Sequence, residues 1–181
     1  MTNQIPQLRM VLQDLSKWHV DASIPSGFSL RTYQPGYEEY WRLIISESFH
    51  MEVGQDKWRM EMLEKEGYRP ERVFFIFDDA GVPCATASAM RIGGEQHGYV
   101  HYVGTRPAFT GRMLGYHVTA VVTQAFQQEG CLDATLDTDP YRIPAIRIYL
   151  KLGYRPLIIH EKHRDIWNDI RQQTGINFKV C

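Results

Sequence analysis

The chain has 181 residues, of which 44% are hydrophobic and 23% are charged, a composition that suits one globular domain with its own core. Its 20 Lys and Arg nearly balance its 21 Asp and Glu, and the net charge of −1 argues against nucleic acid or an anionic membrane as a partner. No apolar run approaches the roughly 20 residues that a membrane-spanning helix needs. The first residues also lack the apolar core of a signal peptide.

The three cysteines, Cys84, Cys131 and Cys181, are scattered and form no Cys-x-x-Cys motif. This spacing predicts neither a disulfide framework nor a zinc site. We therefore expect a protein that works in a reducing cytoplasm and binds no metal.

The N-terminal segment, residues 1–26, has two interpretations. Its apolar side chains follow a helical spacing from Leu8 to Trp18, yet Pro6 and Pro25 bracket a stretch that an extended strap would explain equally well. We expect either a short helix or a strap that packs on the domain.

From Phe28 onward, alternating and helical patterns succeed one another between glycine and proline breaks. Strands are expected at residues 28–33, 72–77, 82–92, 97–105, 132–137 and 154–159, and helices at residues 37–49, 58–63, 111–129 and 143–152. Residues 27–160 are thus predicted to form one α/β domain. The tail, residues 161–181, is predicted to pack back on it.

The most informative stretch runs from Gly98 to Gly115, where a strand, a tight loop and the start of a helix follow one another directly. The first N–H groups of a helix have no partner inside the helix, and the helix dipole adds partial positive charge there. Such an end is a ready site for phosphate. The stretch therefore predicts a phosphate-bearing cofactor.

Two motifs in this order of elements carry a family resemblance. The loop has Pro107 followed, three residues later, by Thr110-Gly111-Arg112-Met113-Leu114-Gly115, and the helix at 143–152 has Ala145, Tyr149, Gly153 and Tyr154 in an A-x-x-x-Y-x-x-x-G-F/Y pattern. Over residues 27–159 the chain resembles the GNAT superfamily of acyl-CoA N-acyltransferases. The loop pattern of the family is R/Q-x-x-G-x-G/A, and Gly115 matches its last position. Thr110 stands where Arg or Gln is usual, and Met113 stands where the first Gly is usual. Gly111 is a glycine that compensates for these departures in the loop. Arg142 stands where an Asn is often found.

The resemblance implies a single α/β domain with a mixed, splayed central sheet and helices on both faces. It implies that acetyl-CoA is the cosubstrate, with its pantetheine arm along the strand at 97–105 and its pyrophosphate on the loop that follows. The residues expected to bind it are Val103, Gly104, Thr105, Thr110, Gly111, Arg112, Met113, Leu114 and Gly115.

Acyl transfer to an amine requires a neutral amine, a polarised carbonyl and a protonated leaving thiolate. The resemblance makes Tyr149 the general acid, and a backbone N–H near Val103 or Gly104 is expected to polarise the carbonyl. For the base we favour His101, because its ordinary pKa of about 6.5 suits proton transfer near neutrality. Strand alternation groups Tyr99, His101, Val103 and Thr105 on one face. In the arylalkylamine N-acetyltransferases, which this strand resembles, two histidines occur, and Tyr99 replaces the first of them.

Simpler interpretations stay open for each of these residues. For His101 the alternative is a hydrogen-bonded strand histidine, and for Tyr149 it is an aromatic side chain packed on the helix. Cys84 is interpreted as a small core residue. Glu47 is a weaker candidate base in the acceptor site. Arg106, Arg112, Arg147 and Lys151 are candidate phosphate contacts or solvated surface charges. The histidine pairs His97/His101 and His160/His163 lack the spacing or the partners of a metal site.

The sequence thus predicts an N-acetyltransferase that moves an acetyl or short acyl group from coenzyme A to a primary amine, directly and in one ternary complex. A small-molecule or peptide amine would be the acceptor, and a homodimer is possible. The alternative is a non-catalytic relative that binds coenzyme A or a partner. Residues 46–57 and the tail after 159 are expected near the acceptor. Trp58, Tyr68 and Trp167 suggest an apolar acceptor wall or belong to the core.

Overall fold

Seven strands form one mixed sheet in the order β2-β3-β4-β5-β6-β1-β7. The computed structural model describes residues 6–181, so the first five residues of the predicted N-terminal segment lie outside the described residues. The strands are β1 (Leu8–Leu12), β2 (Phe28–Thr32), β3 (Val73–Asp78), β4 (Pro83–Arg91), β5 (His97–Thr105), β6 (Asp133–Thr138) and β7 (Arg155–Leu157). The helices are α1 (Glu38–Phe49), α2 (Gln55–Trp58, extended by a π-helical turn at Arg59–Leu63), α3 (Leu114–Gln128), α4 (Ile143–Leu152) and α5 (His163–Thr174).

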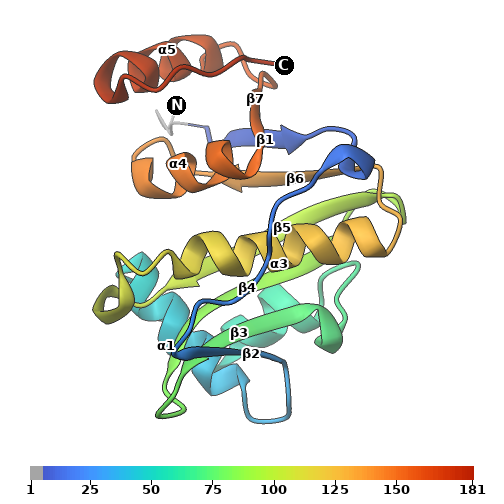
Figure 1. The fold of residues 1–181 in the computed structure, drawn as a ribbon, viewed down its shortest axis with the longest axis vertical. Helices are drawn as coiled ribbons and strands as arrows, with labels where there is room; N and C mark the ends of the chain where they lie inside the picture. Colours follow the sequence, from blue (N-terminus) through green and yellow to red (C-terminus); the bar gives the residue numbers. More distant parts are fainter. Residues whose placement is uncertain (1–5) are drawn as a thin grey trace.

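These elements confirm the predicted order of strands and helices from Phe28 to β7. The first part of the N-terminal segment is a strand, which neither expectation described. Leu8–Leu12 form a strand that pairs antiparallel with β6 on one side and with β7 on the other. β1 is therefore part of the sheet, neither a helix nor a strap laid over it. The chain then crosses from the upper to the lower half of the sheet in Figure 1 before β2 begins.

Two apolar clusters cover opposite faces of the sheet. One packs α1 and α2 against β3, with Trp41, Ile45 and Phe75 at its centre. The other contains Phe126 of α3 and Trp167 of α5. The helices thus lie on both faces, as predicted, and Figure 1 shows α3 running across the strands of the lower half.

β4 explains how helices can approach both faces closely. Its residues from Pro83 to Met90 are all buried, and most of them are Ala, Ser, Thr or Cys. Small side chains on each face leave room for α1 on one side and α3 on the other. Like β3, β4 contributes residues to both clusters.

The sheet splays between β5 and β6. These strands run parallel and pair only from His97 to Val100, opposite Asp133 to Leu136. Beyond Val100, β5 stays paired with β4 as far as Thr105. The backbone edge of β5 that would have bonded to β6 is left facing an opening, and this confirms the splayed sheet predicted from the sequence.

The tail after residue 159 forms α5, which the sequence patterns did not mark as a helix. Trp167 and Ile170 of α5 are buried in the same cluster as α3, so the tail packs on the domain. Among residues 6–181, no helix has the length and apolar character needed to cross a membrane.

Replacing Met10 with Ala tests whether β1 is integral to the domain. Met10 is fully buried in the middle of β1, and truncating a buried Met costs about 2–5 kcal/mol. We expect urea denaturation to show a loss of this size, while Gln13→Ala, an exposed site just after β1, changes little. A loss for Met10→Ala no larger than that of the control would mean that β1 contributes nothing to the core.

Candidate functional site

A β-bulge in β5 determines which side chains reach the opening. Ser88 of β4 lies opposite His101 and Thr86 lies opposite Gly104, so two residues of β5, Tyr102 and Val103, face one residue of β4. Tyr102 has a φ of +47°, a conformation that non-glycine residues rarely adopt. A bulge of this kind adds one residue to a strand and bends it.

The bulge reverses the alternation of side chains along β5. A Cβ on Gly98 would lie 2.6 Å from the Phe126 ring of α3, whereas a Cβ on Gly104 would lie 2.9 Å from Ile45 of α1. A regular strand would point both residues to the same face. The expectation that Tyr99, His101, Val103 and Thr105 share one face is therefore wrong. His101 lies on the α2 side, where it bonds to Glu61, and Val103 packs on the α3 side.

One cavity, of about 360 Å³, opens at the start of α3, and we call it the α3 cavity. Of the predicted cofactor-binding residues, it is lined by Val103, Thr105, Thr110, Gly111, Met113, Leu114 and Gly115. Two predicted residues are not among its lining residues: Gly104 faces α1, and Arg112 is exposed, with its guanidinium 5.6 Å from the centre of the Phe109 ring. α4 closes the far side with Ala145, Ile148 and Tyr149.

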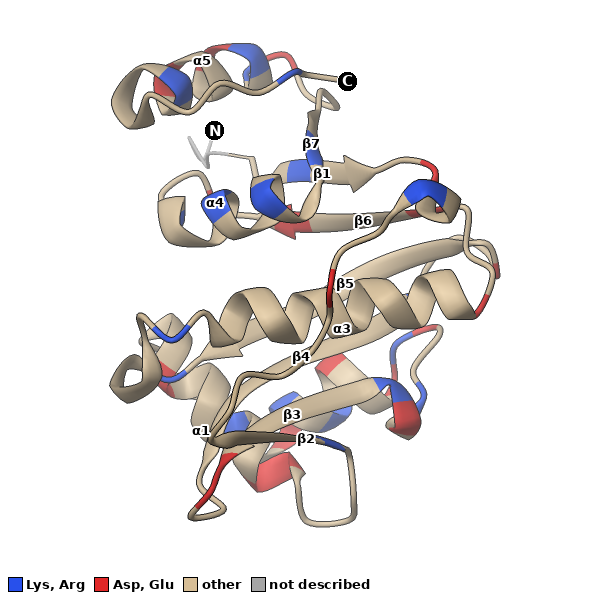
Figure 2. Ribbon diagram, viewed as in Figure 1, with Lys and Arg blue, Asp and Glu red and all other residues tan. Residues whose placement is uncertain are grey.

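The N-terminus of α3 leaves its first N–H groups available to a ligand in this cavity. No side chain caps the helix, and its first turn holds no acidic residue. α3 contains no Lys, Arg, Asp or Glu at all, as its uniform tan colour in Figure 2 shows. The loop geometry explains the glycine usually found at the position of Met113, because Met113 adopts the left-handed region with a φ of +59°. Gly111 is also left-handed.

Ser48 adds a polar atom that the sequence patterns did not reveal. Its Oγ is buried, has no hydrogen-bond partner within residues 6–181, and belongs to a side chain that lines the α3 cavity. A buried hydroxyl without a partner is unfavourable by about 1–3 kcal/mol unless a ligand or water completes it. The residues around this cavity therefore fit a ligand with phosphate at the helix end and a polar arm beside Ser48.

A second cavity, of about 490 Å³, lies in the opening between β5 and β6, and we call it the β6 cavity. Its walls are Tyr99 to Val103 of β5, Leu136 to Asp139 at the end of β6, and residues from α1, α2 and α4. The two cavities share Val103, Arg142, Ala145 and Tyr149. They therefore meet at the point where the sheet splays.

Tyr149 of α4 lies at this junction. The residue is buried, and burial raises the pKa of its phenol to about 12. The hydroxyl has no hydrogen-bond partner among residues 6–181. Its oxygen is not completely buried, and the side chain lines both cavities, so the hydroxyl borders open space. A phenol with this pKa keeps its proton at neutral pH and remains available as a donor.

His101 lies in the wall of the β6 cavity, and its tautomer is determined by one contact. Its Nε2 is 2.9 Å from the Glu61 carbonyl oxygen, which accepts only, so Nε2 carries the proton. No hydrogen bond within residues 6–181 occupies Nδ1. Burial lowers the pKa of His101 despite the opposing hydrogen bond to Glu61, so the ring stays neutral at pH 7 with Nδ1 as a free acceptor.

Arg142, which replaces an expected Asn, spans the junction. Its Nε donates to Asp139 over 3.1 Å, and its guanidinium lies 3.9 Å from the centre of the Phe49 ring. Phe49 ends α1 on one half of the sheet, while Arg142 precedes α4 on the other half. This cation–π contact joins the two halves across the opening.

Several other predicted candidates lie elsewhere. Glu47 and Arg106 form a two-bond ion pair of 2.9 and 3.0 Å, so neither is free for an acceptor or a phosphate. Trp58 and Trp167 belong to the apolar clusters, and Tyr68 packs against Trp58. Cys84 is buried in the core, as a small apolar residue would be, and burial raises the pKa of its thiol. Among residues 6–181, no three His, Cys, Asp or Glu side chains are grouped to hold a metal.

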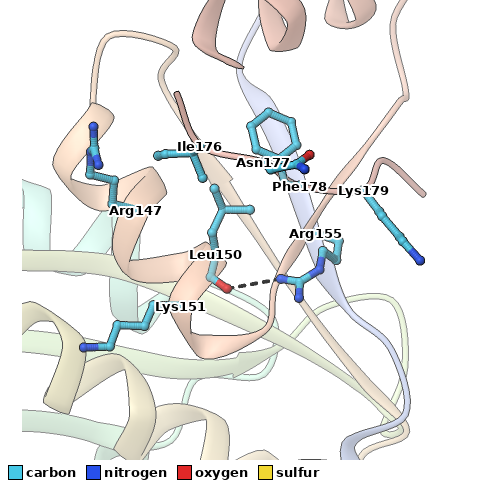
Figure 3. A pocket seen from close by; sticks show the side chains of 8 residues that line it. All are labelled: Arg147, Leu150, Lys151, Arg155, Ile176, Asn177, Phe178 and Lys179. Carbon is cyan, nitrogen blue, oxygen red and sulfur yellow. Dashed lines mark hydrogen bonds between the residues drawn. The ribbon is translucent and has the colours of Figure 1, made fainter. Parts of the chain in front are cut away.

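Arg147 and Lys151 line a separate open groove of about 730 Å³ between α4, β7 and the tail. In Figure 3 their charged ends point away from Arg155 and Lys179, and Leu150 lies between the two pairs. These two side chains lie on the opposite face of α4 from Ala145 and Tyr149. The groove is therefore separate from the junction of the two cavities.

The protein-family model described as the acetyltransferase (GNAT) family matches residues 36–154. Among curated proteins, the chain is similar to the mycothiol acetyltransferase of Thermomonospora curvata, at 29% identity over 82% of this chain and 50% of that protein. The mycothiol acetyltransferase of Saccharomonospora viridis is 27% identical over 72% of this chain and 47% of that protein. The chain spans about half the length of the curated relatives it matches.

Solved structures share the fold. A GCN5-related N-acetyltransferase from Sphaerobacter thermophilus matches with a TM-score of 0.70 at 21% identity, over 83% of this chain and 48% of that one. One from Kribbella flavida matches with a TM-score of 0.59 at 24% identity, over 84% of this chain and 55% of that one. The predicted fold class is thereby confirmed.

Replacing Met113 with Gly tests the strain in the loop. The left-handed conformation costs a residue with a Cβ about 1 kcal/mol, and glycine avoids this cost. We expect Met113→Gly to raise the free energy of unfolding by about 1 kcal/mol, measured by chemical denaturation. Met113→Ala keeps the Cβ and serves as the matched control. Equal stability of the two variants would show that the loop is not strained at this residue.

Proposed function

Because this chain belongs to the acetyltransferase (GNAT) family, we propose that it transfers an acetyl group from acetyl-CoA to a primary amine. The transfer is direct and takes place in one ternary complex, without an acyl-enzyme. The observation that supports this best is the meeting of two cavities at Tyr149, one beside the free N-terminus of α3 and one beside His101.

The α3 cavity suits the cosubstrate. The N–H groups at Leu114 and Gly115 bind the pyrophosphate, and the free edge of β5 between His101 and Thr105 pairs with the amide-containing arm. The Ser48 hydroxyl gives that arm a further partner. Acetyl-CoA, when bound, supplies a thioester carbon that accepts the amine nitrogen.

The chain's own residues then manage two protons. His101 Nδ1 takes the proton that the amine nitrogen loses as the new C–N bond forms, and Tyr149 donates its phenolic proton to the sulfur as the C–S bond breaks. A backbone N–H near Val103 or Gly104 stabilises the negative charge on the carbonyl oxygen. Solvent exchange returns both side chains to their starting states.

The departures at Thr110 and Met113 do not favour the non-catalytic alternative. Met113 adopts the backbone conformation that a glycine would adopt, and the Thr110 hydroxyl donates to the Pro107 carbonyl, which stabilises the same loop. The first experiment is a titration with acetyl-CoA by calorimetry, followed by an assay of coenzyme A release with primary amines. Binding without amine-dependent release would favour the non-catalytic alternative. A homodimer and a cytoplasmic location stay predictions.

Tyr149→Phe removes the proposed acid and keeps the ring. General acid catalysis contributes roughly a hundredfold or more, so kcat should fall by about that factor while the Kd for acetyl-CoA stays nearly constant. Tyr116→Phe on α3, which borders neither cavity, is the control. A large loss of acetyl-CoA affinity with kcat preserved would make Tyr149 a binding residue.

The pH profile tests His101. A base with a lowered pKa stays neutral until the pH falls below its ordinary value of 6.5, so the acidic limb of kcat/KM should lie below pH 6.5. Tyr149, with a pKa of about 12, should add no alkaline limb between pH 7 and 10. His101→Gln retains a donor for the Glu61 carbonyl but cannot titrate, so this limb should vanish. An unchanged acidic limb in His101→Gln would show that another residue is the base.

A further inference from the structure

The walls of the β6 cavity carry an unusual excess of carboxylates. Glu61, Asp137 and Asp139 line it, and Arg142 is the one Lys or Arg among the described lining residues. Arg9 bonds both oxygens of Asp137 at 2.8 Å, yet it is not among the residues that line the cavity. Among the described lining residues, three carboxylates thus face the cavity against one cation.

Asp139 and Glu61 keep their charge at neutral pH. Burial would raise the pKa of Asp139, but its hydrogen bonds from Gln7, Tyr141 and Arg142 outweigh burial, so the pKa is lowered. Burial is likewise the largest influence on Glu61, and the ion pairs with Lys57 and Lys65 together lower its pKa. Lys57 and Lys65 do not line the cavity. An occupant at neutral pH thus meets ionised carboxylates.

Arg142 is poorly placed to bind an anionic occupant. Its guanidinium is held by Asp139 through Nε and stacks on Phe49. Its positive charge is already shared with Asp139, so an anion in the cavity would compete with that carboxylate for the same guanidinium. A carboxylate or phosphate on the occupant would face three carboxylates and one guanidinium that is already paired, and like charges placed together cost several kcal/mol.

The remaining polar groups favour hydrogen-bond donors on the occupant. Carboxylate oxygens only accept, and the hydroxyls of Tyr99, Thr138 and Tyr141 and the amide of Gln7 accept as well as donate. A volume of about 490 Å³ is large enough for a small molecule of several hydroxyl groups. The base candidate, His101, is in the same wall.

We propose that the acceptor of this enzyme is a small, polar amine rich in hydroxyl or amine groups, such as an amino alcohol or an amino sugar, and that acceptors bearing a carboxylate or phosphate are excluded. The inference rests on the proposed acetyl transfer and names the substrate class for it. The amine nitrogen forms the C–N bond, the C–S bond of acetyl-CoA breaks, and coenzyme A leaves as the thiol.

Two matched pairs of acceptors test the proposal. 2-Amino-1,3-propanediol has a hydroxymethyl group where serine has a carboxylate. Glucosamine 6-phosphate is glucosamine with one added phosphate. We expect kcat/KM, measured by coenzyme A release, to be about tenfold or more higher for 2-amino-1,3-propanediol than for serine. The same difference is expected for glucosamine over glucosamine 6-phosphate. Phenethylamine, which lacks hydroxyl groups, should be a poor acceptor.

Asp139→Asn identifies the cause of this selectivity. The change removes one charge from the wall and releases Arg142, so the ratio of kcat/KM for 2-amino-1,3-propanediol over serine should fall several-fold. Asp133→Asn is the control, because Asp133 lies at the other end of β6, bonded to His97 and outside the cavity. A ratio of two substrates does not depend on how much of each variant is folded.

The outcomes separate this inference from the proposed function. Serine or glucosamine 6-phosphate used as well as its partner would overturn the inference and leave acetyl transfer intact. An unchanged ratio in Asp139→Asn would also overturn it. Coenzyme A release that no amine raises above the background hydrolysis of acetyl-CoA would overturn the proposed function itself, and the inference with it.

Discussion

The parting of β5 from β6 after Val100 is the constraint on which the site depends. A parallel pair that continued to Thr105 would satisfy the edge of β5 and close the space between the strands. The bulge at Tyr102 and Val103 bends β5 while β4 keeps its pairing, so the edge opens without loss of the sheet. Both cavities exist because of this geometry, and Tyr149 is at their junction because α4 follows directly from β6.

Side chains at the ends of α1 and α4 hold the two halves of the splayed sheet in a defined relation. Arg142 stacks on Phe49 across the opening, and within one half the Glu47–Arg106 ion pair fixes the end of α1, which carries Phe49, to the residue that follows β5. An Asn at the position of Arg142 would be too short to reach Phe49. The departure from the family pattern at this position therefore joins the halves and also makes Arg142 the one Lys or Arg among the described residues that line the β6 cavity.

Periodicity predicted most of the elements, because the helices and outer strands bury one face and expose the other. β1 was ambiguous because a central strand is buried on both faces, and five residues from Leu8 to Leu12 do not distinguish a strand from a helix. The bulge carried no sequence signal, since Tyr102 is not a residue that favours a positive φ. Asp137 of the β6 cavity did have a signal, because Asp133, Thr135 and Asp137 alternate with buried residues along β6. Only the splay shows that Asp137, at the far end of this polar face, borders a cavity.

The position of β1 has a consequence for how the chain folds. Arg9 and Asp137 are partners across adjacent strands although they lie 128 positions apart, and β7 contacts β1 rather than β6. Most of the chain must therefore be present before this part of the sheet can close, and contacts of such long range make loop closure slow. Until then β1 has no neighbour, and its apolar side chains stay open to association with other strands. A chaperone that shields β1 in the nascent polypeptide would act on this vulnerable interval.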